Sequence, residues 1–568
     1  MKPLLKPLLI AGIVLGQLAT HAQTAQRQEK DFGVILNLDG DISFTSNDPV
    51  ETTNLIRANI DLIHSLGIKT LTYSVASGSD VLNYPTKVGS TVGWRTTKYD
   101  ENEFWRVRNE KARVCIAAGV DAINVAASQA KTHQGMLFIP SLRMNDSHYM
   151  RDPENYPLTG EFRLKNPDLI IKNGPWPFNK QMYGNLLDYT HEKVRKYRLD
   201  VIFEVIDRNK QYIDGFELDF NRVQVFFPEG KGEERAHLIT DLVKKVREKL
   251  NLVAKEQGRP MYLFARIPPA EESCKVYGLD IDTWMKQGLV DMLSPAQLMT
   301  LAQDMPIENM IAKANRYNVK VYPSVYARAN VRAAFIPSAP TLGINRPIAR
   351  SGTTEEAVGA VSNYFQMGAH GIYLYNHFRK EMHPFVAAVT NRDLDGLDKV
   401  FSITKTYYND HLEPSYAYVK QLPYKTKAAV SAFNLYVGEI PSQSSFPLTK
   451  CLLRLGIRDL ADGAVPKLTL NGKELTHFIT EDHLKAAKGK RFLADAAHKS
   501  VVYKINDPTV LKLGNNKIEI TVQNATITDL EIGYSYLNNL NYRLAGLPMP
   551  KLNEAFVMPV INEVDDIN

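Results

Sequence analysis

Short apolar runs alternate with helical patterns along residues 33–400. Eight of the runs have the length and the branched or aromatic content that predict β-strands, and segments with apolar residues at helical spacing separate them. The predicted strands are residues 33–39, 69–75, 136–142, 212–222, 261–267, 289–293, 319–326 and 371–375. Eight strands that alternate with helices predict an α/β fold, a (β/α)8 TIM barrel with long insertions.

Three helical patterns stand out among the segments that separate these strands. Asp48 and Pro49 predict the start of the first helix. A second pattern covers residues 104–120, after a loop at 76–100 that is long enough to suggest a functional role. Thr190 is the predicted N-cap of a third helix. The apolar side of that third helix consists of Val194, Tyr197, Val201 and Val205.

A different pattern begins near Tyr424, where short strand-like runs follow one another without helical segments. These runs are residues 428–437, 452–457, 467–470, 501–505, 517–522 and 528–532. We therefore predict an all-β sandwich domain at 425–545, after a barrel domain at 30–420 and before a C-terminal tail at 546–568. The sandwich is either a carbohydrate-binding module or a packing domain. The second interpretation is favoured, because the sequence identifies no exposed aromatic platform.

The first 22 residues have the pattern of a secretory signal peptide. Lys2 and Lys6 precede an apolar run at 8–18, and small residues occupy the −3 and −1 positions of a cut before Gln23. This run is too short for a permanent membrane anchor. No later segment is apolar for long enough, so we expect no transmembrane segment in the mature chain. The expected location is secreted or periplasmic.

Composition and cysteine content exclude several classes of partner and cofactor. The 68 basic and 62 acidic residues of the 568-residue chain give a net charge of +6 without a long basic run, so no nucleic-acid partner is expected. Cys115, Cys274 and Cys451 are far apart and odd in number, which argues against a disulfide framework or a structural zinc site. Cys115 is expected to be a buried helix residue. No metal or other cofactor is predicted.

Candidate chemistry is concentrated in the fourth predicted strand. Side chains alternate along a strand, so Glu217 and Asp219 share one face with Asn221, while the apolar residues between them point the other way. The Cα atoms of the two acids are then about 6.5–7 Å apart. Carboxylates held this close have different proton affinities, which gives an enzyme an acid and a base. The alternative is a half-exposed strand whose acids are solvated or paired with arginines.

Polar and aromatic residues also follow the other predicted strands. The active site of a (β/α)8 barrel lies at the carboxyl ends of its strands. Such a lining suits a poly- or oligosaccharide, whose hydroxyls form hydrogen bonds and whose rings pack on aromatic side chains. A single residue of this kind at a strand end is more often hydrogen-bonded within the protein than in contact with a ligand. The predicted substrate-binding residues are Arg143, Asn145, Asp146, His148, Asn221, Arg222, Arg266, Tyr322, Tyr326, Asn376 and His377.

Four strand-end arginines leave the charge of the substrate open. Guanidinium groups bind sulfate and carboxylate with two hydrogen bonds, so an anionic glycan is one interpretation. The other, which is favoured, is that the arginines neutralise four nearby acids. The arginines are Arg143, Arg222, Arg266 and Arg328. The acids are Asp146, Glu217, Asp219 and Asp291.

Several other barrel chemistries lack their residues in this chain. The first strand has no His-x-His pair for a metal, the sixth strand ends without a lysine for a Schiff base, and no glycine-rich phosphate loop follows the last two strands. Hydrolysis by two carboxyl groups remains the simplest chemistry. In glycosidases these groups lie about 5–5.5 Å apart for retention and about 6.5–9.5 Å apart for inversion.

Three segments carry a resemblance to a known group of enzymes. Residues 214–220 (Asp-Gly-Phe-Glu-Leu-Asp-Phe), 141–146 and 278–291 resemble the secreted family-10-like glycoside hydrolases of bacterial polysaccharide-degradation systems. The resemblance covers residues 30–400. It implies a (β/α)8 glycosidase that acts outside the cytoplasm.

Two departures from better-understood families limit what the resemblance implies. Family 10 xylanases carry a glutamate on strand seven, whereas residues 319–326 contain no acid. Family 18 chitinases carry their catalytic glutamate where Asn221 stands. We therefore predict only that Asp219 is the nucleophile or base and that Glu217 is the acid or tunes Asp219. A non-catalytic glycan-binding barrel is the alternative, and a structural outer-surface protein is a third interpretation.

Overall fold

A computed structural model gives the structure of most of the chain. It describes residues 30–40, 43–145, 154–171, 186–221, 223–297, 301–330, 349–351, 353–375, 377, 383–403, 421–422, 424–426, 429–482 and 498–537. Its helices and strands all belong to the compact unit Gly33–Asn568. None of the helices in the described ranges is long and apolar enough to cross a membrane. The predicted signal peptide and C-terminal tail lie outside the described residues.

The main sheet is parallel and contains every strand that the sequence predicts for the barrel. Its order is β10-β9-β8-β7-β6-β2-β1-β14-β11, and all of its neighbouring strands pair in parallel. The strands are β1 (Ile35–Leu38), β2 (Thr70–Ser74), β6 (Leu137–Arg143), β7 (Gly215–Asp219), β8 (Tyr262–Ile267), β9 (Met292–Pro295), β10 (Lys320–Val321), β11 (Ser324–Tyr326) and β14 (Tyr373–Tyr375).

The seventh predicted strand is divided into β10 and β11, which form the two ends of the sheet. Only Tyr322 and Pro323 separate them. Tyr322 N donates to the Leu293 carbonyl on one side, and Tyr373 N donates to the Pro323 carbonyl on the other, at 2.9 and 3.1 Å. Proline has no N–H to continue a ladder, which explains the interruption at this point.

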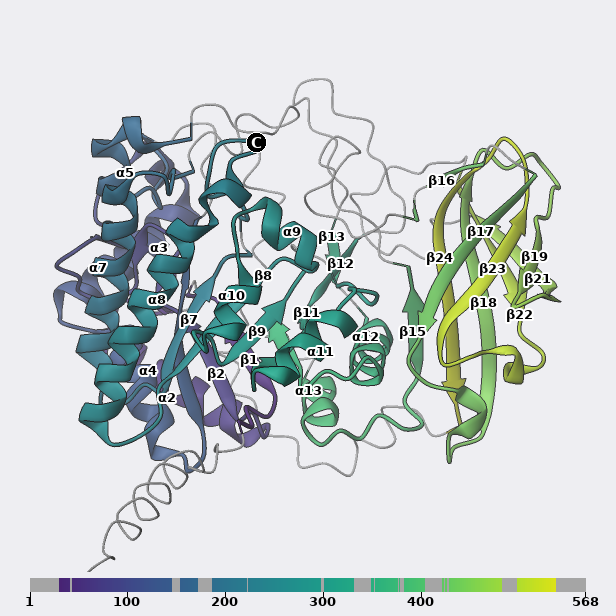
Figure 1. Cartoon of the computed structure of the whole chain (residues 1–568), viewed down its shortest axis with the longest axis horizontal. Helices are drawn as coiled ribbons and strands as arrows, with labels where there is room; N and C mark the ends of the chain where they lie inside the picture. The colour runs from purple at the N-terminus through teal and green to yellow at the C-terminus, as the bar shows by residue number, and fades with distance from the viewer. Residues whose placement is uncertain are drawn as a thin grey trace, which may run out of the picture. The chain divides into compact units, whose positions relative to one another are not determined.

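Helices alternate with these strands, and Figure 1 shows the long neighbours α7 and α8 side by side. In the described ranges the helices are α2 (Pro49–Ser65), α3 (Glu103–Ala117), α4 (Ala122–Thr132), α5 (Glu161–Lys165), α7 (Glu192–Asn209), α8 (Gly232–Gln257), α9 (Glu271–Val276), α10 (Ile281–Lys286), α11 (Glu308–Arg316), α12 (Thr354–Gln366) and α13 (His383–Thr390). A parallel sheet with alternating helices confirms the predicted α/β class.

Helix ends follow local chemistry, with two differences from prediction. Asp48 caps α2 as expected, and its side chain accepts hydrogen bonds from two backbone N–H groups of the first turn. The N-cap position of helix α7 is held by His191, without a side-chain capping hydrogen bond, and not by Thr190, whose hydroxyl accepts a hydrogen bond from Arg235. The predicted helix at 104–120 ends earlier, because Gly119 adopts a left-handed conformation before α4 begins. Cys115 is buried in α3, as predicted.

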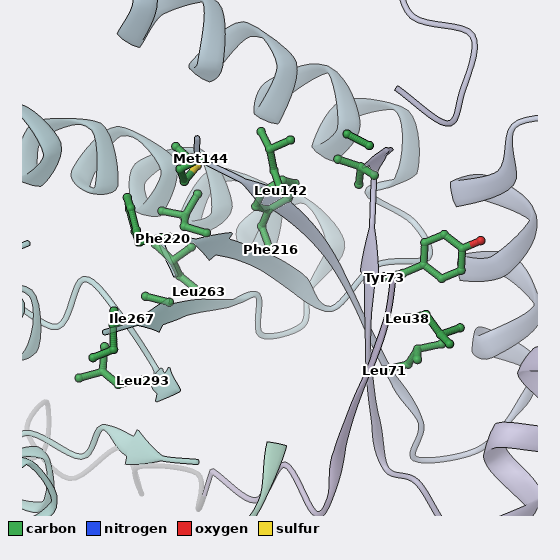
Figure 2. Close-up of a cluster of buried hydrophobic side chains, with 14 of the residues drawn as sticks. Leu38, Leu71, Tyr73, Leu142, Met144, Phe216, Phe220, Leu263, Ile267 and Leu293 are labelled. Atoms are coloured by element: carbon green, nitrogen blue, oxygen red, sulfur yellow. The ribbon is translucent and has the colours of Figure 1, made fainter. Parts of the chain in front are cut away.

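Apolar side chains of β6 and β7 form the outer layer of the sheet. Figure 2 shows Leu142, Phe216 and Phe220 within this layer. The Phe220 ring lies 5.4 Å from the ring of Trp284 in α10. Because side chains alternate along a strand, Glu217 and Asp219 point to the opposite, inner face. The predicted register of the fourth strand is therefore confirmed.

The loop predicted at 76–100 has structure of its own. It contains the small strands β3 (Ala76–Ser77), β4 (Val81–Leu82) and β5 (Ser90–Thr91), which pair with one another. Asp80 lies between β3 and β4 and forms ion pairs with Arg163 and Arg198. All three side chains are buried. Although burial opposes the charged form, the two guanidinium groups hold the pKa of Asp80 at about 2.

The C-terminal part contains antiparallel sheets, as the sequence predicts. One sheet has the order β15-β24-β18-β22-β21, with β16 also paired to β24, and the other has the order β17-β23-β19-β20. Both contribute to one apolar core, in which Leu453 and Phe433 are members. The strands are β15 (Lys399–Ser402), β16 (Tyr424–Lys425), β17 (Val430–Val437), β18 (Leu448–Arg458), β19 (Lys467–Leu470), β20 (Lys473–Glu474), β21 (Thr476–Asp482), β22 (His498–Lys504), β23 (Gly514–Thr521) and β24 (Thr526–Tyr536).

Strand β15 was not predicted, and it lies before the predicted boundary at residue 425. It pairs with β24, so residues 399–402 belong to the antiparallel part. A further antiparallel pair, β12 (Arg328–Asn330) with β13 (Ala349–Ser351), follows β11. Both pairings join segments that are distant in the sequence, and this is why local pattern did not reveal them.

Replacing Asp80 by Asn tests the buried ion pairs. The change leaves Arg163 and Arg198 without their counter-charge, so the free energy of unfolding should fall by about 3–5 kcal/mol. The exposed Asp241→Asn on α8 is the matched control and should change it by less than about 0.5 kcal/mol. Urea unfolding at pH 7 measures both.

The low pKa of Asp80 also predicts how the stability of the protein depends on pH. The contribution of ionised Asp80 is fully present above the unfolded-state pKa of about 3.9 and is lost as the pH falls towards the folded value of about 2. The stability difference between wild type and Asp80→Asn should shrink across that window. An unchanged difference down to pH 2 would contradict the ion-pair assignment.

Candidate active site

The carboxyl group of Glu217 lies inside the curled sheet and is held from two sides. Ser141 Oγ on β6 and the Tyr373 hydroxyl on β14 both donate to Glu217 Oε1, at 2.7 and 2.9 Å. Three strands separate β14 from β7 in the sheet. The Tyr373 contact therefore spans the concave side of the sheet. The Tyr373 hydroxyl also lies 2.8 Å from Thr72 Oγ1 on β2.

Glu217 has the proton affinity of a group that titrates near neutral pH. Its burial, and then the negative charge of Asp219, raise its pKa to about 7 against the opposing effect of the two hydroxyl donors. Oε2 of Glu217 is buried and has no hydrogen-bond partner among the described residues. Raised pKa values of this kind are typical of general acids.

Asp219 lies two residues further along β7 and is held as part of an ion pair. Arg266 on β8 donates from one terminal nitrogen to both carboxylate oxygens, at 3.0 and 3.2 Å. The backbone N–H of Asn221 donates to Oδ1 at 2.9 Å. The Arg266 guanidinium lies 4.1 Å from the ring centre of Tyr375, on which Tyr326 stacks at 5.1 Å. This layer therefore combines charge with two aromatic faces.

Asp39 adds a third carboxylate to the site, one that was not among the predicted site residues. It directly follows β1 and forms a 2.6 Å ion pair with Arg143, which also contacts the Tyr375 hydroxyl at 3.4 Å. Its side chain is 14% exposed, compared with 4% for Asp219. The signal was present in the sequence, because Asp39 is the last residue of the first predicted strand, and the predicted site residues were also chosen at strand ends.

The two strand-end arginines whose side chains the structure describes, Arg143 and Arg266, are paired, as the favoured interpretation predicts, but with partly different acids. Arg266 pairs with Asp219 as expected, whereas Arg143 pairs with Asp39. Asp291 was wrongly placed at a carboxyl end: it precedes β9, and it forms a 2.7 Å ion pair with Arg247 of α8. The predicted strand began three residues too early, and a slip of this size moves a side chain to the other end of a short strand.

Two predicted substrate-binding residues have structural roles. The Asn145 amide group donates to the carbonyls of Leu187 and Val225, and its Oδ1 accepts from Leu187 N, so it joins two loops. Tyr322 is buried at the interruption between β10 and β11, where its ring fills the space beside Gly371. A Cβ atom at Gly371 would lie 2.2 Å from Tyr322 Cε1. Asn145 and Tyr322 therefore have contacts within the protein, and their predicted roles in substrate binding stay predictions.

His377 and Asn221 each keep one polar atom unbonded among the described residues. The His377 ring contacts the Val325 carbonyl through Nε2 at 3.0 Å, and burial lowers its pKa to about 4, so the ring is neutral at pH 7. Its Nδ1 has no partner there, and neither has Nδ2 of Asn221, whose Oδ1 accepts from Gln224. Both side chains are buried. The four remaining predicted residues, Asp146, His148, Arg222 and Asn376, lie outside the described residues, as does the side chain of Arg328.

The described part of the chain contains no group of three or more His, Cys, Asp or Glu residues that could hold a metal ion. Its three cysteines are buried and not joined by disulfides. The reactive groups gathered on the concave side of the sheet are the carboxyl groups of Glu217 and Asp219, the hydroxyls of Ser141 and Tyr373 and the guanidinium group of Arg266.

Comparisons with known proteins find only distant similarity. No family model matches the chain, and no curated protein does. Similar solved structures include chitinase ChiW from Paenibacillus sp. str. FPU-7 (TM-score 0.39, 9% identity, covering 85% of this chain and 52% of that one). Another is a noncanonic maltogenic α-amylase, AmyB from Thermotoga neapolitana, with a TM-score of 0.35 and 6% identity. That match covers 86% of this chain and 99% of the amylase.

A third similar structure is a cycloisomaltooligosaccharide glucanotransferase from Paenibacillus sp., with a TM-score of 0.32 and 10% identity. The match covers 88% of this chain and 58% of that one. This chain thus spans little more than half the length of the glucanotransferase and of ChiW. At TM-scores below 0.5, these likenesses assign neither a family nor an activity.

Replacing Glu217 by Gln should change the pH dependence of stability. A pKa raised to about 7 means that folded Glu217 keeps its proton where the unfolded chain, with a pKa of about 4.3, has lost it. Stability should therefore fall as the pH rises from about 4.3 to 7, by about 4 kcal/mol in total. The Gln variant lacks this loss, so it should gain stability relative to wild type at pH 8 compared with pH 4.

Urea unfolding of wild type and Glu217→Gln at pH 4 and pH 8 measures this difference. The exposed Glu248→Gln on α8 is the matched control and should show the same small effect at both pH values. Equal effects of Glu217→Gln at the two pH values would show that the pKa of Glu217 is not raised by folding.

Proposed function

We propose that this protein is a glycoside hydrolase in which Glu217 is the general acid. The observation that carries the proposal is a buried carboxyl group with a pKa of about 7, one of whose oxygens has no hydrogen-bond partner in the described part of the chain. Such a group holds a proton at neutral pH and can give it to the oxygen of a leaving sugar.

The proposal includes a closed eight-stranded barrel. Segments β10 and β11 are treated as one strand, interrupted at Pro323, that bonds to β9 on one side and to β14 on the other. Closure would bring the carboxyl ends of all eight strands into one ring. Active sites of (β/α)8 enzymes occupy that end.

Two carboxylates can serve as the nucleophile or base. Asp219 was predicted for this role, but its ion pair with Arg266 and its bond from Asn221 N also suit a group that raises the pKa of Glu217. Asp39 is the alternative, because its side chain is the more exposed of the two. Either choice gives the pair of carboxyl groups that glycoside cleavage requires.

The proposed substrate is a poly- or oligosaccharide, and the aromatic part of the proposed site is the buried stack of Tyr326 and Tyr375. An anionic glycan receives less support than a neutral one, because Arg143 and Arg266 are already paired with aspartates. Secretion or periplasmic export through the predicted signal peptide belongs to the same proposal, and would bring the enzyme to extracellular polysaccharide.

A non-catalytic glycan-binding barrel is the second candidate. The observation that favours it is Asn221, which stands where family 18 chitinases carry their catalytic glutamate and whose side-chain oxygen is bonded to Gln224. The complete burial of Glu217 points the same way. In this case the polar layer inside the sheet would bind sugar or stabilise the fold without turnover.

Measuring reducing-end release from a panel of neutral and anionic polysaccharides distinguishes the two candidates. Glu217→Gln should lower the rate by about 100-fold or more, because it removes the proton donor. Asp219→Asn and Asp39→Asn identify the second carboxylate, since the one that acts should cause a loss of similar size. Glu248→Gln is the control and should retain wild-type activity.

The pH dependence adds an independent check. Asp219→Asn removes the negative charge that raises the pKa of Glu217, so the decline in activity at high pH should move to lower pH. Activity that survives both Glu217→Gln and Asp219→Asn would refute the catalytic assignment. Binding of a glycan without turnover by the wild type would favour the second candidate.

A further inference from the structure

A chain of hydrogen bonds crosses the concave side of the sheet and ends on Glu217. Asn37 Nδ2 on β1 donates to Thr72 Oγ1 at 3.1 Å, Thr72 Oγ1 lies 2.8 Å from the Tyr373 hydroxyl, and Tyr373 donates to Glu217 Oε1 at 2.9 Å. Each of these side chains is 3% exposed or less. The chain therefore lies where water does not compete for the bonds.

The bonds have a defined direction. A hydroxyl has one proton to donate, so Tyr373, which donates to Glu217, must accept its bond from Thr72. Thr72 in turn accepts from an amide N–H of Asn37, and this leaves its own proton for Tyr373. Ser141 Oγ donates to the same Glu217 oxygen from the neighbouring strand, where Ser141 and Glu217 are register partners. Oε1 thus receives two hydrogen bonds.

We infer that Tyr373 and Ser141 place the proton of the Glu217 carboxyl group on Oε2, the oxygen that has no partner in the described part of the chain. A protonated carboxyl has one carbonyl-like oxygen that accepts and one O–H that donates. A proton on Oε1 would face the hydrogens of both donors. The neutral group therefore keeps Oε1 as its acceptor and directs its O–H away from β6 and β14.

Tyr373 and Ser141 are, on this inference, positioning residues for the acid named above. The inference rests on the proposed function for its catalytic meaning, because only an acid that reacts needs its proton on a particular oxygen. The placement of the proton is nevertheless a property of the resting protein. It can be measured without substrate.

Infrared difference spectra of the full-length protein between pH 5 and pH 9 test the placement. Wild type should show the C=O band of a protonated carboxyl that disappears with a midpoint near pH 7 and is missing in Glu217→Gln. In Tyr373→Phe the band should move to higher frequency, because the carbonyl oxygen loses a hydrogen bond. The midpoint should rise by about one pH unit, as the carboxylate loses a donor worth about 1.5 kcal/mol.

Ser141→Ala should produce the same two shifts and serves as the second variant in case Tyr373→Phe does not fold. The matched control is Tyr364→Phe, which removes a buried hydroxyl that donates to the Ala302 carbonyl, away from this network. It should leave the band and its midpoint unchanged. Circular dichroism verifies that each variant is folded.

An unchanged band frequency in both Tyr373→Phe and Ser141→Ala would overturn the inference, because the proton would then be on Oε1. This failure is separate from failure of the proposed function. If the shifts occur but the wild type hydrolyses no glycan, the proton placement holds and the catalytic role is lost. If Glu217 is essential for hydrolysis but the shifts do not occur, the catalytic role holds and the inference fails.

Discussion

Burial of Glu217 beside Asp219 is the constraint on which the inner face of the sheet depends. Two ionised carboxylates at this spacing would repel each other in a medium that screens them poorly. The structure resolves the conflict differently for each group. Arg266 compensates the charge of Asp219, whereas burial and the nearby charge of Asp219 let Glu217 retain its proton near neutral pH despite its two hydroxyl donors. The two acids are thus chemically different although they lie on one strand.

The compensation extends beyond the fourth strand through a continuous set of contacts. Arg266 lies on the ring of Tyr375, whose hydroxyl contacts Arg143, which in turn pairs with Asp39. Strands β7, β8, β14 and β6 and the residue after β1 are joined by these contacts. A substitution of one member would therefore leave another buried charge without its partner, a cost of several kcal/mol. The charged side chains at this end of the sheet therefore depend on one another for their stability.

The features that the sequence predicted correctly depend on patterns between residues close together in the chain, and the features that it missed depend on contacts between distant residues. The parallel strands, the buried stripe of α7 and the inward direction of Glu217 were predicted correctly, because each depends on a local period of apolar residues. The internal hydrogen bonds of Asn145 were not predicted, since its partners at Leu187 and Val225 are far away in sequence. The strand β15 was missed for the same reason, as it is defined by pairing with β24. Asp39 could have been found, because it is the last residue of a predicted strand.

The sequence by itself determined that the acids at 217 and 219 share one face of a strand, since a two-residue period requires it. It also determined the α/β class of the first part and the antiparallel class of the second. Only the tertiary structure decided which acid keeps a proton, because that depends on Arg266, Ser141 and Tyr373, which come from three other strands. Proton affinity is set by neighbours in space, and a linear pattern does not specify those neighbours.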